Sequence, residues 1–91
     1  MDFEWDAAKS AGNAVARGLP FDLAILLFDR PVLQRIDDRQ DYGEVRVRAI
    51  GMIGDVILHC VYADRGDMRR IISLRHANRK ERDAYRATQA S

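Results

Sequence analysis

The sequence predicts an α+β domain: a short N-terminal strand, two helices, an antiparallel sheet of about four strands and a C-terminal helix. Three observations predict this order. Apolar residues recur at helical spacing in two early segments, apolar and polar residues alternate between glycine-containing turns from residue 45 onward, and a capping motif precedes the last segment. Because the chain has 91 residues and 47% hydrophobic content, we expect one domain over residues 1–91.

The first half of the chain is expected to hold one strand and two helices. Residues 3–5 place two aromatic side chains on one face of an extended segment. Asp6 suits the N-cap of a helix, and Gly18 stands where a left-handed residue ends one, so the first helix is predicted between them. A second helical pattern covers residues 21–28, and Pro31 ends it.

The second half is expected to be mostly extended. Strands are predicted over residues 32–36, 45–50, 56–62 and 68–74, with a polar loop over 37–43. The segment 56–62 is nearly all apolar, which predicts a central strand. Asn78 and Glu81 have the spacing of a capping box, and this motif predicts a last helix that extends to about Gln89.

Several classes of protein are disfavoured by composition. The first residues are acidic rather than basic and then apolar, and no apolar run approaches the roughly 18 residues of a membrane span. The single cysteine, Cys60, has no partner for an internal disulfide. We therefore expect a soluble cytoplasmic protein without membrane contact.

Metal-dependent and triad chemistry have little support in the sequence. The soft or imidazole ligands are His59, Cys60 and His76, too few for a closed zinc site, and neighbouring strand positions point apart. We expect His59 and Cys60 to be structural. Neither a Ser/His/Asp spacing nor a glycine-rich phosphate loop is present. No metal and no cofactor are predicted.

Positive charge is concentrated in the last third of the chain. Residues 65–86 carry eight basic and three acidic side chains, a pattern typical either of a phosphate-binding surface or of a solvated helix. Alternation puts Arg46 and Arg48 on one face of a strand, and it predicts that Arg69 and Arg75 share a face of the last strand near Arg65. Together they form either a cationic shelf or an ordinary solvated face.

Two further residues have open roles. Glu44 lies close to Arg46 in sequence and is a candidate general base, an orienter of an arginine, or half of an ion pair at a strand end. Tyr85 is the single large aromatic residue of the last predicted helix. It either anchors that helix or stacks on a nucleobase beside the basic shelf.

One set of residues, in this order and spacing, resembles the BrnT toxins over almost the whole chain. The set comprises Phe3-Glu4-Trp5-Asp6, Lys9, Asn13, Gly18, Asp38-Arg39, Tyr42-Gly43-Glu44, Arg46, Gly51, Val61-Tyr62, Arg70-Ile71-Ile72-Ser73, Arg75, Glu81-Arg82 and Tyr85. The resemblance implies a RelE-like fold and a toxin that cleaves RNA within a type II toxin-antitoxin module. It also implies a BrnA antitoxin that blocks the toxin in a heterotetramer with two of each chain, and binding to operator DNA through the antitoxin.

The resemblance to a metal-free RelE-like nuclease suggests a mechanism. The 2′-hydroxyl of RNA attacks the neighbouring phosphorus, so the site must accept a proton and neutralise the charge on phosphorus. We hypothesise that Arg46 and Arg75 clamp the scissile phosphate, with Arg65 assisting and Glu44 as general base. In this scheme Tyr85 stacks on the base, and further arginines hold the RNA. These further arginines are Arg48, Arg69, Arg79 and Arg82.

Two other interpretations remain open. His76, next to Arg75, is a less favoured candidate for the general acid, because a continuing strand turns it to the other face. The chain could instead be a non-catalytic binding module that acts as co-repressor with the antitoxin on operator DNA. A third alternative, a partner that contacts protein alone, predicts no RNA binding at low salt.

Overall fold

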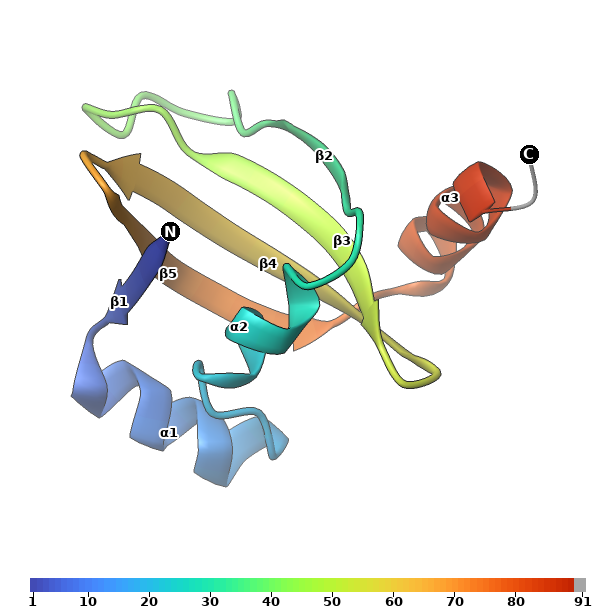
Figure 1. Cartoon of the computed structure of the whole chain (residues 1–91), viewed down its shortest axis with the longest axis horizontal. Coiled ribbons are helices and arrows are strands. Elements are labelled where there is room, and N and C mark those ends of the chain that lie inside the picture. Colours follow the sequence, from blue (N-terminus) through green and yellow to red (C-terminus); the bar gives the residue numbers. More distant parts are fainter. Residues whose placement is uncertain (90–91) are drawn as a thin grey trace.

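The computed structural model describes residues 1–89, which form a curved sheet flanked by helices (Figure 1). The elements are β1 (Asp2–Trp5), α1 (Ala7–Arg17), α2 (Leu23–Leu27), β2 (Leu33–Ile36), β3 (Val47–Ile53), β4 (Val56–Arg65), β5 (Met68–His76) and α3 (Arg79–Gln89). The described residues thus confirm the predicted α+β order. None of the described helices combines the length and apolar character needed to cross a membrane.

The sheet has the order β1-β5-β4-β3-β2 within the described residues. The strands from β2 to β5 pair antiparallel, as predicted, and β4 lies at the centre because the apolar segment that begins it is covered on both faces. β1 adds a fifth strand, parallel to β5. The helical connection between β1 and the rest of the sheet makes this parallel pairing possible.

The first helix follows its sequence signals closely. The carboxylate of Asp6 accepts a hydrogen bond from the backbone N–H of Lys9 at 3.0 Å, and Gly18 ends α1 with a φ of 70°. The amide of Asn13 donates to the carbonyl of Leu74 at 2.9 Å, which ties α1 to the edge of β5 beyond the end of β1. The second helix is shorter than expected, since it begins at Leu23.

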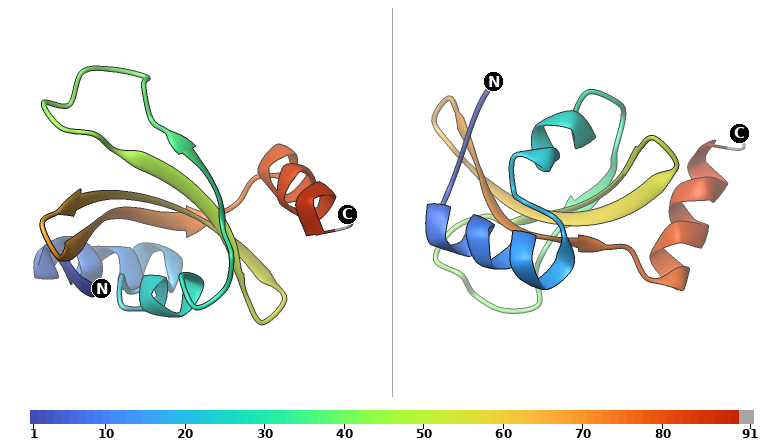
Figure 2. Two further views of the ribbon diagram at one scale, coloured as in Figure 1. Left: turned by 45° about the horizontal axis from the view of Figure 1, so that its top comes forward. Right: turned by 90° about the horizontal axis from the view of Figure 1, so that it is seen from below.

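The two faces of the sheet differ in what covers them (Figure 2). On the core face, Ala49, Cys60 and Leu74 pack with Leu27 of α2 in the main hydrophobic cluster. Gly51 lies inside β3 rather than in the predicted turn. Glycine suits this strand position because an added Cβ would come within 2.7 Å of the Leu27 side chain. The turn after β3 uses Gly54 instead. We call the other side of the sheet the open face.

The last helix covers one end of the open face. Tyr85 is 3% exposed and packs with Ile57 and Ala77 in a second hydrophobic cluster. The predicted capping box is confirmed: the backbone N–H of Glu81 donates to Asn78 Oδ1, and the backbone N–H of Asn78 donates to Glu81 Oε1, both at 2.9 Å. These contacts fix the first turn of α3 beside the sheet.

An irregularity in β5 corrects one prediction. The register between β4 and β5 shifts between Val61 and Tyr62, so Ile71 and Leu74 both reach the core face. Arg69 consequently points to the core face, where its guanidinium lies 4.0 Å from the centre of the Tyr62 ring. Arg75 lies on the open face. The expectation that Arg69 and Arg75 share a face is wrong, because the extra residue between them reverses the alternation.

Candidate functional site

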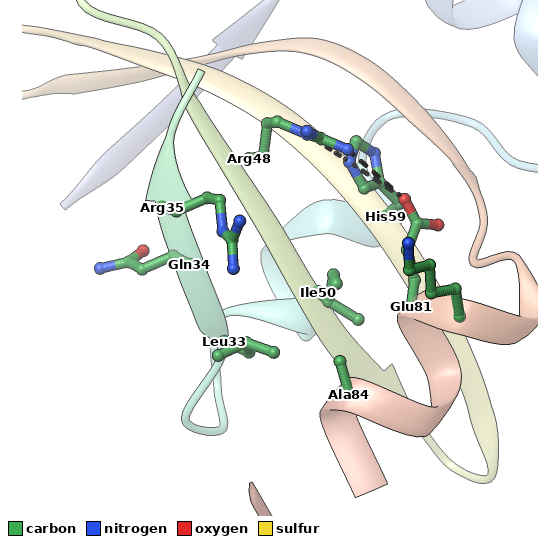
Figure 3. A pocket seen from close by; sticks show the side chains of 9 residues that line it. Leu33, Gln34, Arg35, Arg48, Ile50, His59, Glu81 and Ala84 are labelled. Carbon is green, nitrogen blue, oxygen red and sulfur yellow. Dashed lines mark hydrogen bonds and ion pairs between the residues drawn. The ribbon is translucent and has the colours of Figure 1, made fainter. Parts of the chain in front are cut away.

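Four side chains meet on the open face where α3 begins, and we call them the helix-end cluster: Arg48 from β3, His59 from β4, Arg75 from β5 and Glu81 from α3 (Figure 3 labels all but Arg75). Arg75 donates to both carboxylate oxygens of Glu81, at 2.8 and 2.9 Å. Arg48 Nη2 lies 3.7 Å from Glu81 Oε2. One carboxylate therefore faces two guanidinium groups.

His59 is the most buried member of the helix-end cluster. Its side chain is 2% exposed, and Arg48 Nε donates to its Nε2 at 3.3 Å. Because Nε2 accepts, the ring proton belongs on Nδ1, which is buried without a hydrogen-bond partner among the described residues. Burial, reinforced by the charge of Arg75, lowers the pKa of His59 to about 4. The imidazole is neutral at pH 7.

Glu81 is ionised in the same environment. The hydrogen bonds from Arg75 are the largest cause that lowers its pKa, which falls to about 2 despite the opposing effect of burial. Sequence reasoning assigned Glu81 to a helix cap and His59 to structure, and so missed both as site residues. Their convergence follows from strand register, since His59 pairs with Arg75 on one side and Ile50 on the other.

A pocket of about 290 Å³ adjoins the helix-end cluster between β2, β3 and α3. Leu33, Ile50 and Ala84 form its apolar wall, and Arg35 extends from β2 toward it (Figure 3). Lys80 also lines it. The pocket combines apolar side chains with cations, a composition suited to an anionic ligand with an apolar ring, such as a nucleotide.

A second group of side chains lies near the loop that precedes β3, and we call Tyr42, Glu44, Arg46 and Arg65 the loop-end cluster. Arg65 donates to both oxygens of Glu44, at 2.8 and 3.0 Å. The guanidinium of Arg46 stacks over the Tyr42 ring, 4.2 Å from its centre, and its Nε lies 4.0 Å from Glu44 Oε1. The hydrogen bonds from Arg65 lower the pKa of Glu44.

The two clusters do not meet. Arg46 and Arg75 lie on the same side of the sheet, since Arg46 lines a depression with Val61 and Ser73. Register nevertheless separates their Cα positions by two strand spacings, about 10 Å, and by four residues along the strands, about 13 Å. The Glu44–Arg65 pair is farther away, because Arg65 lies six residues beyond His59 in β4, about 20 Å. In the structure, therefore, these residues form two separate clusters with different partners.

The remaining predicted residues are placed as follows. Arg79 is exposed on the first turn of α3, while Arg82 donates to the carbonyl of Ala77 at 2.7 Å and so helps to hold α3. Arg69 lies on the core face, where it stacks on Tyr62 and pairs with Asp64. The buried ring of Tyr85 anchors α3, which removes it from base stacking. His76 ends β5 and faces away from Arg75, as the alternation predicts.

The fold and the clusters define a class: a small α+β protein whose sheet carries arginine clusters on one face, at the base of a C-terminal helix. The family model described as the ribonuclease toxin BrnT of type II toxin-antitoxin systems matches residues 5–81. The chain belongs to this family of ribonuclease toxins, which confirms the resemblance seen in the sequence, and the family implies an antitoxin partner. A search of curated proteins gave no match.

Proposed function

We propose that the chain is a metal-independent endoribonuclease whose scissile phosphate binds at the helix-end cluster. The observation that carries this proposal is the meeting of Arg48, Arg75 and Glu81 on the open face, beside a pocket of nucleotide character. Arginine matches the geometry of a phosphate with its planar fork and keeps its charge throughout the reaction. The two guanidinium groups then neutralise the charge that develops on phosphorus.

The reaction is an internal transesterification. The 2′-oxygen bonds to the neighbouring phosphorus, the bond from phosphorus to the 5′-oxygen breaks, and the products carry a 2′,3′-cyclic phosphate and a 5′-hydroxyl. Glu81 takes the proton of the 2′-hydroxyl, and the leaving 5′-oxygen takes a proton from water. We assign the base to Glu81 rather than Glu44, because Glu44 belongs to the loop-end cluster with Arg65.

Exchange of partners makes Glu81 more basic when substrate binds. In the free protein, Arg75 is the largest cause of the low pKa of Glu81. A phosphate that takes over donors of Arg75 removes part of this stabilisation and adds a negative charge nearby, and both effects raise the pKa of a carboxyl group. The site thus holds an unreactive carboxylate until RNA is present.

The pocket lined by Leu33, Ile50 and Ala84 takes the nucleobase next to the cleaved bond. This assignment replaces the base-stacking role predicted for Tyr85. We also propose that the antitoxin is of the BrnA type, forms a complex with two of each chain and supplies the contacts to operator DNA. The resemblance of the sequence to BrnT toxins supports this part of the proposal.

The test is RNA cleavage in EDTA, with analysis of product ends. The wild type should give 2′,3′-cyclic phosphate ends, and Arg75→Ala should lower the rate by about 10²–10³. Glu81→Gln should also lose cleavage, although glutamine serves equally well in a capping box and keeps α3 in place. Arg17→Ala removes one exposed positive charge from α1 and is the matched control.

Two outcomes would contradict the proposal. Cleavage that needs a divalent cation overturns the metal-independent mechanism. RNA binding by the wild type without cleavage supports the alternative of a non-catalytic binding module that acts as co-repressor.

A further inference from the structure

A second depression on the open face, of about 420 Å³, lies beside the loop-end cluster. Arg46, Arg39 and Lys9 line it together with Asp37 and the hydroxyl-bearing Ser73. Arg46 Nε is buried and has no hydrogen-bond partner among the described residues. The Arg46 side chain as a whole is 27% exposed, so an anion in the depression can reach the outer part of the guanidinium.

The carboxylates near the depression are already paired. Asp37 accepts two hydrogen bonds from the Arg39 side chain, both at 2.7 Å, and a third from the Tyr42 hydroxyl at 3.2 Å. These contacts, with Arg39 as the largest cause, lower the pKa of Asp37. Glu44 is held by Arg65 in a two-point contact. Arg46 shares Glu44 with Arg65 and contacts it at 4.0 Å without a hydrogen bond, so its charge is only partly compensated. This charge and that of Lys9 can attract an anion.

We infer that this depression binds a second backbone phosphate of the RNA strand, several nucleotides from the cleaved bond. The inference rests on the proposed function at the helix-end cluster. Both sites lie on the same side of the sheet, offset by two strand spacings and by about 13 Å along the strands. A single strand that crosses the open face reaches both, whereas a dinucleotide reaches one.

This arrangement gives the loop-end cluster a role that does not require it to touch the reacting atoms. Stacking on Tyr42 holds the Arg46 guanidinium in place before RNA arrives, which reduces the entropy lost on binding. Lys9 adds a flexible charge from α1, across the depression from the loop. The protein should therefore bind RNA more tightly as the strand lengthens.

The test measures affinity for 2′-O-methyl RNA by fluorescence anisotropy, because this probe lacks the attacking hydroxyl and stays intact. We compare a trinucleotide with a decanucleotide. The wild type should bind the longer probe more tightly, and Arg46→Ala should remove about tenfold of that gain, as expected for one charge-assisted contact. The slope of log affinity against log salt for the decanucleotide should fall by about 0.7, the value of one phosphate on a single strand.

Two further variants make the test decisive. Lys9→Ala changes an exposed side chain outside the loop and should reduce the same length-dependent gain, so a folding defect in Arg46→Ala would not decide the result. Arg17→Ala, on the same helix, should keep the gain. If the gain and the salt slope survive both Arg46→Ala and Lys9→Ala, the subsite does not exist. The two failures are distinguishable. If the proposed function is wrong, the wild type does not cleave RNA; if the subsite is wrong, the variants bind the probe as the wild type does.

Discussion

Arg69 and Arg75 lie six residues apart in one strand, yet the two faces of the sheet use them differently. On the core face, Arg69 stacks on Phe28 and Tyr62 and pairs with Asp64, so its charge is enclosed by aromatic rings and a carboxylate. On the open face, Arg75 contacts Glu81 beside a pocket. The role of an arginine on a strand therefore depends on the strand register and on the helix that covers its face.

Docking of α3 on the open face should depend most strongly on Tyr85. Tyr85→Ala removes the aromatic ring that docks α3, and a buried aromatic replaced by alanine costs about 3–5 kcal/mol. The free energy of unfolding, measured in urea, should fall by this amount, and cleavage should be lost because Glu81 moves with the helix. Tyr85→Leu retains most of the buried apolar surface and should retain RNA affinity. If Tyr85→Leu keeps full stability but loses RNA affinity, the result would instead support the hypothesis that Tyr85 stacks on a nucleobase.

Acid should destabilise the folded protein through His59, which is buried on the open face. The pKa of His59 falls from 6.5 to about 4 through burial, so between these values the unfolded chain binds a proton that the folded chain does not. Stability should therefore decrease as the pH falls from 6.5 toward 4, by on the order of a few kcal/mol. Glu81, lowered from 4.5 to about 2, adds a further loss below pH 4.5.

Urea unfolding across this range checks the prediction. His59→Gln should remove the decrease between pH 6.5 and 4.5 and leave the decrease at lower pH. A parallel decrease in both proteins over the upper interval would assign the effect to other groups.

Most of the fold could be predicted from the sequence because its signals are local. Asp6 and Gly18 mark the ends of α1, the apolar run marks the central strand, and Asn78 with Glu81 marks the start of α3. Each signal depends on residues that are close in sequence. The parallel pairing of β1 with β5 depends on contacts between the ends of the chain, and local patterns do not carry that information.

The candidate site was predicted less well for the same reason. Arginine type and strand position indicated a cationic face, but alternation alone could not reveal the register shift in β5, which places Arg69 on the core face. Successive residues on one face of an extended strand are about 6.6 Å apart. Glu44 and Arg75 were predicted in one site although several such steps separate them. Glu81 was recognised for its local hydrogen bond, and its long-range contact with Arg75 became evident in the structure.

A smaller effect tests the close packing of the core face. In Gly51→Ala, the new methyl group meets Leu27, which is fully buried and has little room to move, so we expect a loss of about 1–3 kcal/mol. Gly12→Ala is the matched control, because nothing lies within 4 Å of its added Cβ in α1. Alanine should stabilise that helix by about 0.5–1 kcal/mol. Equal changes in thermal unfolding would contradict the packing difference.

Substitution of Arg69 should change stability less than the variants above. Arg69→Ala removes the stacking on Phe28 and Tyr62, which is worth about 0.5–2 kcal/mol for a partly buried guanidinium. Because Arg69 points to the core face, its loss should lower the unfolding temperature while RNA cleavage at a permissive temperature stays close to that of the wild type. Arg75→Ala should show the reverse pattern, a large loss of cleavage. If Arg69→Ala lowers cleavage as strongly as Arg75→Ala while the protein remains folded, the division of labour between the two faces is wrong, and RNA must contact both sides of the sheet.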